Sequence, residues 1–293
     1  MEKRIIPESE LIINADGSAF HIHLRPDQLT DKIIMVGDPG RVDMVASFFD
    51  TQEFEVSARE FHTIGGTFNG EKVMCISHGI GPDNIDIVIT ELDALANVDF
   101  NTRQIRYEHR TLSMVRIGTS GALQPEITLG TPVIAQRSIG FDGVLNYYAG
   151  RDQVADLDYE KALMKHTDWN ANWAKPYVVS ADPELVAKIG KDDMLLGTTI
   201  SAVGFYGPQG RRVRLDLANP DLNRRIEEFE YKGNRITNYE MESAPLAGMG
   251  ALLGHKCMTV CSIIANRFNT EMNTNYKGGM RDLVARVLER LTE

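Results

Sequence analysis

Two segments of the sequence combine arginine with glycine and hydroxyl residues, the groups that bind a phosphate-like oxyanion. They are residues 37–41 (Gly-Asp-Pro-Gly-Arg) and residues 116–122 (Arg-Ile-Gly-Thr-Ser-Gly-Ala). Glycine lets the backbone approach a ligand, while hydroxyl and guanidinium groups donate hydrogen bonds to oxyanion oxygens. An arginine at the end of a buried strand also needs an anionic partner, because its charge is costly to bury alone. Together the two segments predict a site for free phosphate or a small phosphorylated ligand.

Neither segment matches the loops that bind nucleotides. No Gly-Lys-Ser/Thr follows either one, and neither is a Gly-x-Gly-x-x-Gly that opens a helix with an acidic residue about 20 positions later. ATP and NAD are therefore poor candidates, and we expect no organic cofactor.

Two later segments carry groups suited to a base and a sugar. Residues 205–211 (Phe-Tyr-Gly-Pro-Gln-Gly-Arg) place an amide and a guanidinium two positions apart behind two aromatic rings. This set fits the carbonyl and N–H edge of a pyrimidine. Residues 238–244 (Asn-Tyr-Glu-Met-Glu-Ser-Ala) place two carboxylates before an apolar helix, and Glu242 is the better candidate to accept from two vicinal hydroxyls. Each segment alone also fits a plainer role, a charged loop or a complement to a helix dipole.

The cysteines predict neither disulfides nor a metal centre. Cys75, Cys257 and Cys261 each lie in an apolar context, which indicates buried reduced thiols. No histidine pair lies at zinc spacing from them. No Ser-His-Asp or Cys-His arrangement stands out either, so we expect no metal ligand set and no covalent nucleophile.

The composition is that of a globular chain whose main partner is not a nucleic acid. Apolar residues make up 43% of the 293 positions and charged residues 25%, which are ordinary values. The formal net charge of −10 argues against a polyanionic partner. No apolar run reaches the roughly 18 residues that a membrane span needs, and the first residues do not resemble a secretory signal. We expect a cytoplasmic protein.

Alternating strand and helix signals predict an α/β fold with a mixed sheet covered by helices, in one domain. Strands are expected at 32–36, 63–68, 72–77, 112–117, 132–136, 194–200 and 258–264. Helices are expected at 42–49, 82–96, 184–188, 223–229, 241–253 and 283–291. Asn69-Gly70 predicts a hairpin between two of the strands. Residues 1–19 are interpreted as an irregular extension, and residues 97–111 as a solvated insertion.

In this order along the chain, the segments resemble the nucleoside phosphorylase family from about residue 20 to the C-terminus. Residues 37–41 resemble its GDPxR loop, 58–61 its REF element, 116–122 its RIGTxGA loop and 238–244 its NYEMESA segment. Residues 205–211 resemble the FYxGQxR segment of the branch that cleaves uridine. The resemblance implies a single three-layer α/β/α domain with a central mixed sheet. It also implies reversible phosphorolysis of uridine to uracil and ribose 1-phosphate, a pentosyl transfer in pyrimidine salvage.

The resemblance also implies a role for each candidate residue. Phosphate would be held by Gly37, Arg41, Arg116 and Thr119, with Arg59 from a neighbouring subunit. Uracil would be held by Ser120, Gly121, Phe205, Gln209 and Arg211, and ribose by Met241, Glu242 and, across a dimer interface, His21. The expected catalytic set is Arg116, Gln209, Arg211 and Glu242.

Sites shared in this way imply an obligate homodimer, and family members commonly assemble dimers into a hexamer. Glu60 matches a position where some members hold a potassium ion between subunits, so this ion is the only metal that the resemblance suggests.

The chain departs from the family pattern at several positions. Residues 83–84 are Asp-Asn where uridine-cleaving relatives carry Pro-Ser, and residues 207–208 are Gly-Pro where Pro-Gly or Glu-Gly is more usual. Asn266 occupies the position where purine-specific relatives carry an aspartate that protonates the base, so a pyrimidine is favoured. Three alternatives stay open: a purine nucleoside phosphorylase, a hydrolytic nucleosidase and a nucleoside-binding protein without activity.

Overall fold

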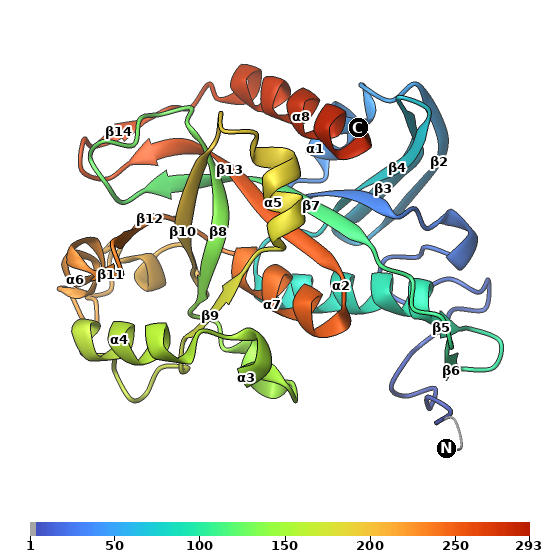
Figure 1. Cartoon of the computed structure of the whole chain (residues 1–293), viewed down its shortest axis with the longest axis horizontal. Coiled ribbons are helices and arrows are strands. Elements are labelled where there is room, and N and C mark those ends of the chain that lie inside the picture. The colour runs from blue at the N-terminus through green and yellow to red at the C-terminus, as the bar shows by residue number, and fades with distance from the viewer. Residues whose placement is uncertain (1–3) are drawn as a thin grey trace.

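The computed structural model describes residues 4–293, and its strands and helices alternate along most of the chain (Figure 1). The strands are β1 (Lys32–Val36), β2 (Thr51–Ala58), β3 (Phe61–Phe68), β4 (Glu71–Ser77), β5 (Val98–Asp99), β6 (Gln104–Ile105), β7 (Ser113–Ala122), β8 (Pro132–Gly140), β9 (Tyr177–Ser180), β10 (Leu195–Ser201), β11 (Glu230–Tyr231), β12 (Asn234–Glu240), β13 (Lys256–Asn266) and β14 (Glu271–Met272). The helices are α1 (Gly40–Ala46), α2 (Pro82–Asn97), α3 (Arg151–Val154), α4 (Leu157–Thr167), α5 (Pro183–Gly190), α6 (Leu222–Glu228), α7 (Ser243–Leu253) and α8 (Lys277–Thr292).

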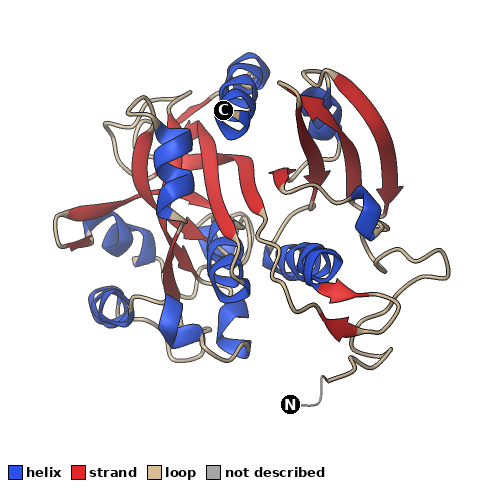
Figure 2. Cartoon of the chain, turned by 45° about the vertical axis from the view of Figure 1, so that its right-hand side comes forward, coloured by secondary structure: helices blue, strands red, loops and turns tan. Residues whose placement is uncertain are grey.

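The main sheet has 12 strands and is mixed, with helices on both faces (Figure 2). Its order is β11, β12, β10, β8, β13, β7, β1, β4, β3 and β2, with β9 beside β8 and β14 beside β13. The expectation of a mixed sheet between helix layers is therefore confirmed.

Strand β1 shows how the apolar pattern builds two cores. Ile33 and Met35 face one core together with residues of α2 and α7, whereas Ile34 and Val36 face the other with residues of α1, α5 and α8. A parallel strand buried on both faces is apolar along its whole length, as this one is. The two helix layers lie on opposite faces of the sheet (Figure 1).

The sheet also closes on itself, which the sequence does not reveal. Strand β12 pairs in parallel with β10 and antiparallel with the end of β7, where Tyr239 lies opposite Gly121. Strands β7, β13, β8, β10 and β12 thus form a ring, and β1, β4, β3 and β2 extend from it. Register shifts in β10 and β13 help the strands to bend. The closure places the end of the oxyanion segment beside the sugar segment.

Several expectations about elements need correction. Residues 116–122 are strand rather than loop, because β7 continues to Ala122 between β13 and β12. Helix α7 begins at Ser243 and not at residue 241. Strand β2 and helix α4 were not expected, since β2 is largely solvent-exposed and the residues of α4 are mostly polar. The Asn69-Gly70 hairpin is confirmed, with φ values of 53° and 76°.

The two atypical segments differ in structure. Residues 97–111 connect the end of α2 to β7 and contain the hairpin of β5 and β6, a two-stranded sheet separate from the main one. Residues 4–19 contain turns and isolated β-bridges and no helix or strand, and the first three residues of the expected extension lie outside the described part. None of the described helices combines the length and the apolar character that a membrane crossing requires.

Candidate active site

Arg116 on β7 is the centre of the candidate site. Its side chain is buried, and its Nη1 lies 2.9 Å from Glu240 Oε2 while its Nη2 contacts Glu242 Oε2. Burial alone would lower the pKa of Arg116, but Glu242 and Glu240 together raise it above the ordinary value. The guanidinium therefore remains a cation at physiological pH.

The two carboxylates have different roles. Glu240 ends β12 and accepts hydrogen bonds from the backbone N–H groups of Glu242 and Ser243 and from the hydroxyls of Ser201 and Ser243. These bonds use its acceptor capacity to hold the start of α7. Glu242 makes fewer such contacts: besides Arg116 it accepts from the N–H of Gly81 at 2.8 Å and lies near the backbone of Met241. Burial and the nearby Glu240 raise the pKa of Glu242, against the opposing effect of Arg116. Glu242 is thus the carboxylate that retains capacity for a ligand.

The first oxyanion segment lies beside Arg116, as the sequence predicts for neighbouring strand ends. Strands β1 and β7 are parallel partners, and Arg41 Nη1 donates to the carbonyl of Ile117 at 3.3 Å. A Cβ on Gly37 would lie 3.2 Å from the carbonyl oxygen of Gly79, so glycine suits this tight approach. Thr119 follows on β7 and is half-buried. The fold therefore assembles Gly37, Arg41, Arg116 and Thr119 at one edge of the sheet.

Space around the Arg116 guanidinium depends on small neighbours. A Cβ on Gly118 would lie 2.8 Å from Arg116 Nη1 and 2.9 Å from the sulfur of Cys261. Nη1 also donates to that sulfur at 3.7 Å, and burial raises the pKa of the Cys261 thiol to about 12. The thiol is consequently protonated and acts here as a packing group.

His78 is a contact of Arg116 that sequence reasoning missed. It follows β4 directly and is completely buried, and its Nε2 accepts a hydrogen bond from Arg116 Nε at 3.2 Å. Burial, and then the charges of Arg116 and Arg41, lower the pKa of His78 well below its usual value. A single histidine in an apolar stretch carries no signal of this kind; only its position directly before Gly79-Ile80-Gly81 could have drawn attention.

The predicted base segment is also assembled. Gln209 is buried at the end of the short turn Gly207–Gln209, and its Oε1 accepts from Arg211 Nη1 at 2.6 Å. The Arg211 guanidinium lies 3.8 Å from the centre of the Phe205 ring. Arg267, which sequence reasoning also missed, follows β13 and contacts the carbonyl oxygen of Gln209.

Two cations therefore meet at the base segment. Neither Arg211 nor Arg267 has a carboxylate partner among the ion pairs of residues 4–293. Burial and the charge of Arg267 lower the pKa of Arg211 to about 10. Such a pair favours a ligand that carries or develops negative charge.

Hydrogen bonds connect the base segment with the end of β7. Asn238 Nδ2 donates to Ser120 Oγ at 3.0 Å, and Tyr239 lies opposite Gly121. The Tyr239 hydroxyl donates to Asn223, whose Nδ2 in turn donates to the carbonyl of Gln209. Ser120, Gly121 and the half-buried Met241 thus lie between the Arg116 and Gln209 clusters.

Asn266 has a structural role at the end of β13. Its Nδ2 donates to the carbonyls of Gln124 and Ile127, at 3.1 and 2.8 Å, and its Oδ1 accepts from the N–H groups of Phe268 and Asn269. All its hydrogen-bonding groups are occupied, so this side chain offers no acid to a ligand.

Arg59 and His21 lie apart from this assembly. Arg59 is exposed in the turn between β2 and β3, with φ of 56°, and its guanidinium is 5.8 Å from the centre of the Phe20 ring. His21 Nδ1 lies 2.5 Å from Glu91 Oε1. Within residues 4–293 no hydrogen bond or ion pair joins either one to Arg116 or Glu242. A single chain does not bring the whole predicted set together.

One further side-chain cluster has the residue types of a metal site. Ligand atoms of Asp93, His109 and His255 lie within 4.8 Å of one another. However, His255 Nδ1 accepts from the N–H of Leu112, so its Nε2 carries the proton that goes to Asp93. His109 Nε2 lies 2.9 Å from the carbonyl of Leu253, which can only accept. With these nitrogens engaged, the cluster fastens residues 97–111 to the turn between α7 and β13.

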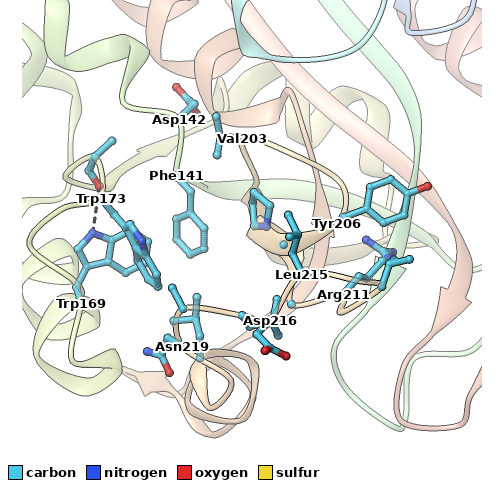
Figure 3. A pocket seen from close by; sticks show the side chains of 18 of the residues that line it. Phe141, Asp142, Trp169, Trp173, Val203, Tyr206, Arg211, Leu215, Asp216 and Asn219 are labelled. Atoms are coloured by element: carbon cyan, nitrogen blue, oxygen red, sulfur yellow. Dashed lines mark hydrogen bonds between the residues drawn. The ribbon is translucent and has the colours of Figure 1, made fainter.

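A cavity of about 780 Å³ lies beside the base segment (Figure 3). Trp169, Trp173 and Phe141 form one side of it, and Tyr206 and Arg211 lie on the other. None of the predicted phosphate residues lines it. The cavity is mostly apolar, and residues of the base segment form part of its lining.

The fold is an α/β fold, and the site has an arginine cluster at Arg116 and a second one at Arg211 and Arg267. Residues 31–293 match the model of the phosphorylase superfamily, and the chain belongs to that family. It is 30% identical over 264 residues to the uridine phosphorylase of Salmonella typhimurium, covering 87% of this chain and 89% of that one. It is 26% identical over 246 residues to a DeoD-type purine nucleoside phosphorylase of Vibrio vulnificus, with 83% of each chain covered.

Among solved structures, a nucleoside phosphorylase of Trypanosoma brucei, described as showing uridine phosphorylase activity, superposes with a TM-score of 0.88. It is 27% identical, and the match covers 96% of this chain and 99% of that one. The expected family and fold are therefore confirmed.

Replacing Asn266 with aspartate should destabilise the protein and should not create activity toward a purine nucleoside. The new carboxylate would face two carbonyl oxygens, and we expect a loss of about 3 kcal/mol in the free energy of unfolding at pH 7.5. A carboxyl group in this place holds its proton more tightly in the folded state than in the unfolded state, so the loss should shrink as the pH falls toward 5. Denaturant unfolding at both pH values measures this, and Asn101→Asp, at an exposed position, is the control. An unchanged stability, or rapid cleavage of inosine, would contradict the role of Asn266.

Proposed function

We propose that this chain is a uridine phosphorylase, which converts uridine and phosphate reversibly into uracil and ribose 1-phosphate. The observation that carries the proposal is that two clusters of polar side chains lie in one site. Arg116, Arg41 and Glu242 form an oxyanion and sugar end, and strand β12 connects this end to the Gln209 and Arg211 pair. A hydrolytic nucleosidase or a nucleoside-binding protein would not require both ends at once.

In this reaction the bond between C1′ of the ribose and N1 of the base breaks, and a phosphate oxygen forms a new bond to C1′. The electron pair of the broken bond goes to the base, which leaves with negative charge and is then protonated. The sugar carries positive charge in between. Catalysis therefore requires positioning of the two substrates and stabilisation of these charges, and no covalent intermediate with the protein.

We assign phosphate to the groups at the ends of β1 and β7. Arg41 and Arg116 supply the charge, Thr119 supplies a hydroxyl, and Gly37 allows close approach of the backbone. Glu242 accepts from the ribose hydroxyls beside Arg116, and Met241 packs against the sugar. Because Glu242 and phosphate both bind Arg116, the nucleophile and the sugar are held by the same guanidinium.

We assign the base to the segment after β10. Phe205 stacks on the uracil, and Gln209 and Arg211 bind its carbonyl and N–H edge, with Ser120 and Gly121 at the other side. Arg267 adds a second positive charge. The unbalanced charge of Arg211 and Arg267 stabilises the anion that the departing base becomes.

We propose that Arg59 and His21 complete the site of a neighbouring subunit, which makes a homodimer the minimal active form and a hexamer the expected assembly. Within residues 4–293 neither residue bonds to Arg116 or Glu242, and Arg59 contacts Phe20, the neighbour of His21, so one surface could deliver both. A potassium ion near Glu60 belongs to the same proposal. The enzyme needs no organic cofactor, and we place it in the cytoplasm.

The purine alternative is disfavoured by one observation. Asn266 occupies the position of the purine-protonating acid, and its amide is fully used by backbone groups. A hydrolytic nucleosidase would have no need for the oxyanion groups at the ends of β1 and β7.

Release of uracil from uridine should depend on added phosphate. We expect rapid release with phosphate and less than about one hundredth of that rate without it, since water is not held beneath C1′ by the arginines. Absorbance measures the release, with inosine and thymidine as comparators. Equal rates with and without phosphate would indicate a nucleosidase, and uridine binding in calorimetry without any release would indicate a binding protein.

Arg211→Ala should lower kcat/KM for uridine by about a hundredfold or more. Removal of one donor that stabilises developing negative charge typically costs about 2.7–4 kcal/mol. Arg212→Ala is the matched control, because Arg212 is exposed and pairs only with Asp216 at the surface. Near-normal cleavage of uridine by the Arg211 variant would remove this residue from the mechanism.

Two inactive variants should restore activity when they share a dimer. Arg59→Ala and Arg116→Ala should each lose activity by about a hundredfold. In a mixed dimer, one site carries both substitutions and the other carries neither, so random pairing should recover about a quarter of the wild-type activity. Co-expression with two different tags and steady-state assay of the purified mixture measures this. Activity no greater than that of the parent variants would show that Arg59 serves its own subunit or none.

A further inference from the structure

His78 is a buried histidine at the phosphate end of the site with one ring nitrogen engaged and the other free. Its backbone N–H donates to the carbonyl of Val36 at 2.9 Å, which places it level with Gly37 across the pair of β1 and β4. A Cβ on Gly37 would lie 3.8 Å from its Cε1. The imidazole thus lies between the Gly37 loop and the Arg116 guanidinium.

The contact with Arg116 determines which nitrogen of His78 carries the proton. Arg116 Nε always bears a hydrogen and donates it to His78 Nε2 at 3.2 Å. Nε2 is therefore the acceptor, and the neutral ring has its hydrogen on Nδ1. A proton on Nε2 would break this hydrogen bond and place two positive groups in contact.

The charge of the ring is determined by its surroundings. Burial and the two neighbouring arginines, Arg116 and Arg41, disfavour the imidazolium, against a weaker effect of the Gly79 backbone. His78 consequently stays neutral across the physiological pH range.

No hydrogen bond of normal geometry reaches the Nδ1 of His78 from the described residues, although the Gly79 backbone lies close to the ring, and this nitrogen is shielded from solvent. A buried N–H without an acceptor is rare in folded proteins and needs an explanation, such as a catalytic role or a bound water or ion. Beside the donors Arg116 and Arg41, an anion oxygen is the acceptor that would fit this position.

We propose that His78 is a phosphate-site residue that acts through both nitrogens, as acceptor for Arg116 and as neutral donor to a phosphate oxygen. The proposal rests on the proposed function and adds a group with two effects. Through Nε2 it holds the Arg116 guanidinium in the orientation in which Arg116 contacts both Glu240 and Glu242. Through Nδ1 it adds a hydrogen bond to the oxyanion without adding charge.

The test compares substitutions that keep or remove the two hydrogen bonds. His78→Leu removes both, whereas His78→Gln keeps an acceptor and a donor on one side chain. We expect His78→Leu to raise the KM for phosphate at least tenfold while the KM for uridine changes less than threefold. His78→Gln should recover most of the loss. Ser138→Ala is the control, because Ser138 is also fully buried with an unpartnered oxygen but lies on β8, outside the proposed site.

Three results would overturn the proposal. They are an unchanged phosphate KM in His78→Leu, an equal rise in both KM values, and a glutamine variant as impaired as the leucine variant. The first would show that His78 does not serve phosphate, the second that the site is generally distorted, and the third that the hydrogen bonds do not matter.

A second measurement is made on the wild-type protein and uses a variant only to assign the signal. Nitrogen-15 spectra of wild-type protein should show His78 with hydrogen on Nδ1 between pH 6 and 8, and inorganic phosphate should shift the Nδ1 resonance. The chain has seven histidines, and the spectrum of His78→Gln assigns the signal. A ring protonated on both nitrogens, or an Nδ1 signal unaffected by saturating phosphate, would refute the proposal. This titration uses phosphate alone, so it remains decisive even if uridine proves not to be the substrate.

Discussion

The burial of one guanidinium constrains much of the site around it. Arg116 lies inside a sheet covered on both faces, where an unpaired charge would be costly. Its neighbours meet that requirement from four different elements: Glu240 ends β12, Glu242 precedes α7, His78 follows β4 and Cys261 belongs to β13. Removal of any one of these elements would leave the cation with an incomplete shell. The contacts of the buried charge therefore stabilise the packing of these four elements, and that packing in turn keeps the charge paired.

Closure of the sheet turns these separate contacts into one site. If β12 paired only with β10, the sugar segment would lie at a distance from β7. Its second pairing brings Asn238 to Ser120 and carries Gln209 with it through Tyr239 and Asn223. The anion end and the base end consequently share a rigid connection of backbone pairs and buried hydrogen bonds, rather than a flexible loop.

The sequence predicted those parts of the site in which several functional residues lie close together along the chain. The arginine and glycine segments and the amide and guanidinium pair were located, and strand ends were expected to collect them. It could not show that residues 116–122 are strand, because a Gly-Thr-Ser-Gly run has the composition of a loop and only pairing with β13 and β12 makes it extended. His78 and Arg267 are single residues outside any recognisable motif, so the sequence gives no sign of their contacts. The roles of Arg59 and His21 depend on a second chain, and both stay predictions, as does the single-domain organisation.

The burial of all three cysteines has a practical consequence for experiments on this protein. Burial raises the pKa of each thiol, and the thiolate is the form that reacts with alkylating or oxidising reagents. The native chain thus resists such reagents, and its labelling rate reports how often the interior opens. Cys261 contacts the Arg116 guanidinium, so the labelling rate of its thiol reports local opening of the structure around Arg116. An anion that binds there and restrains this opening would slow the labelling.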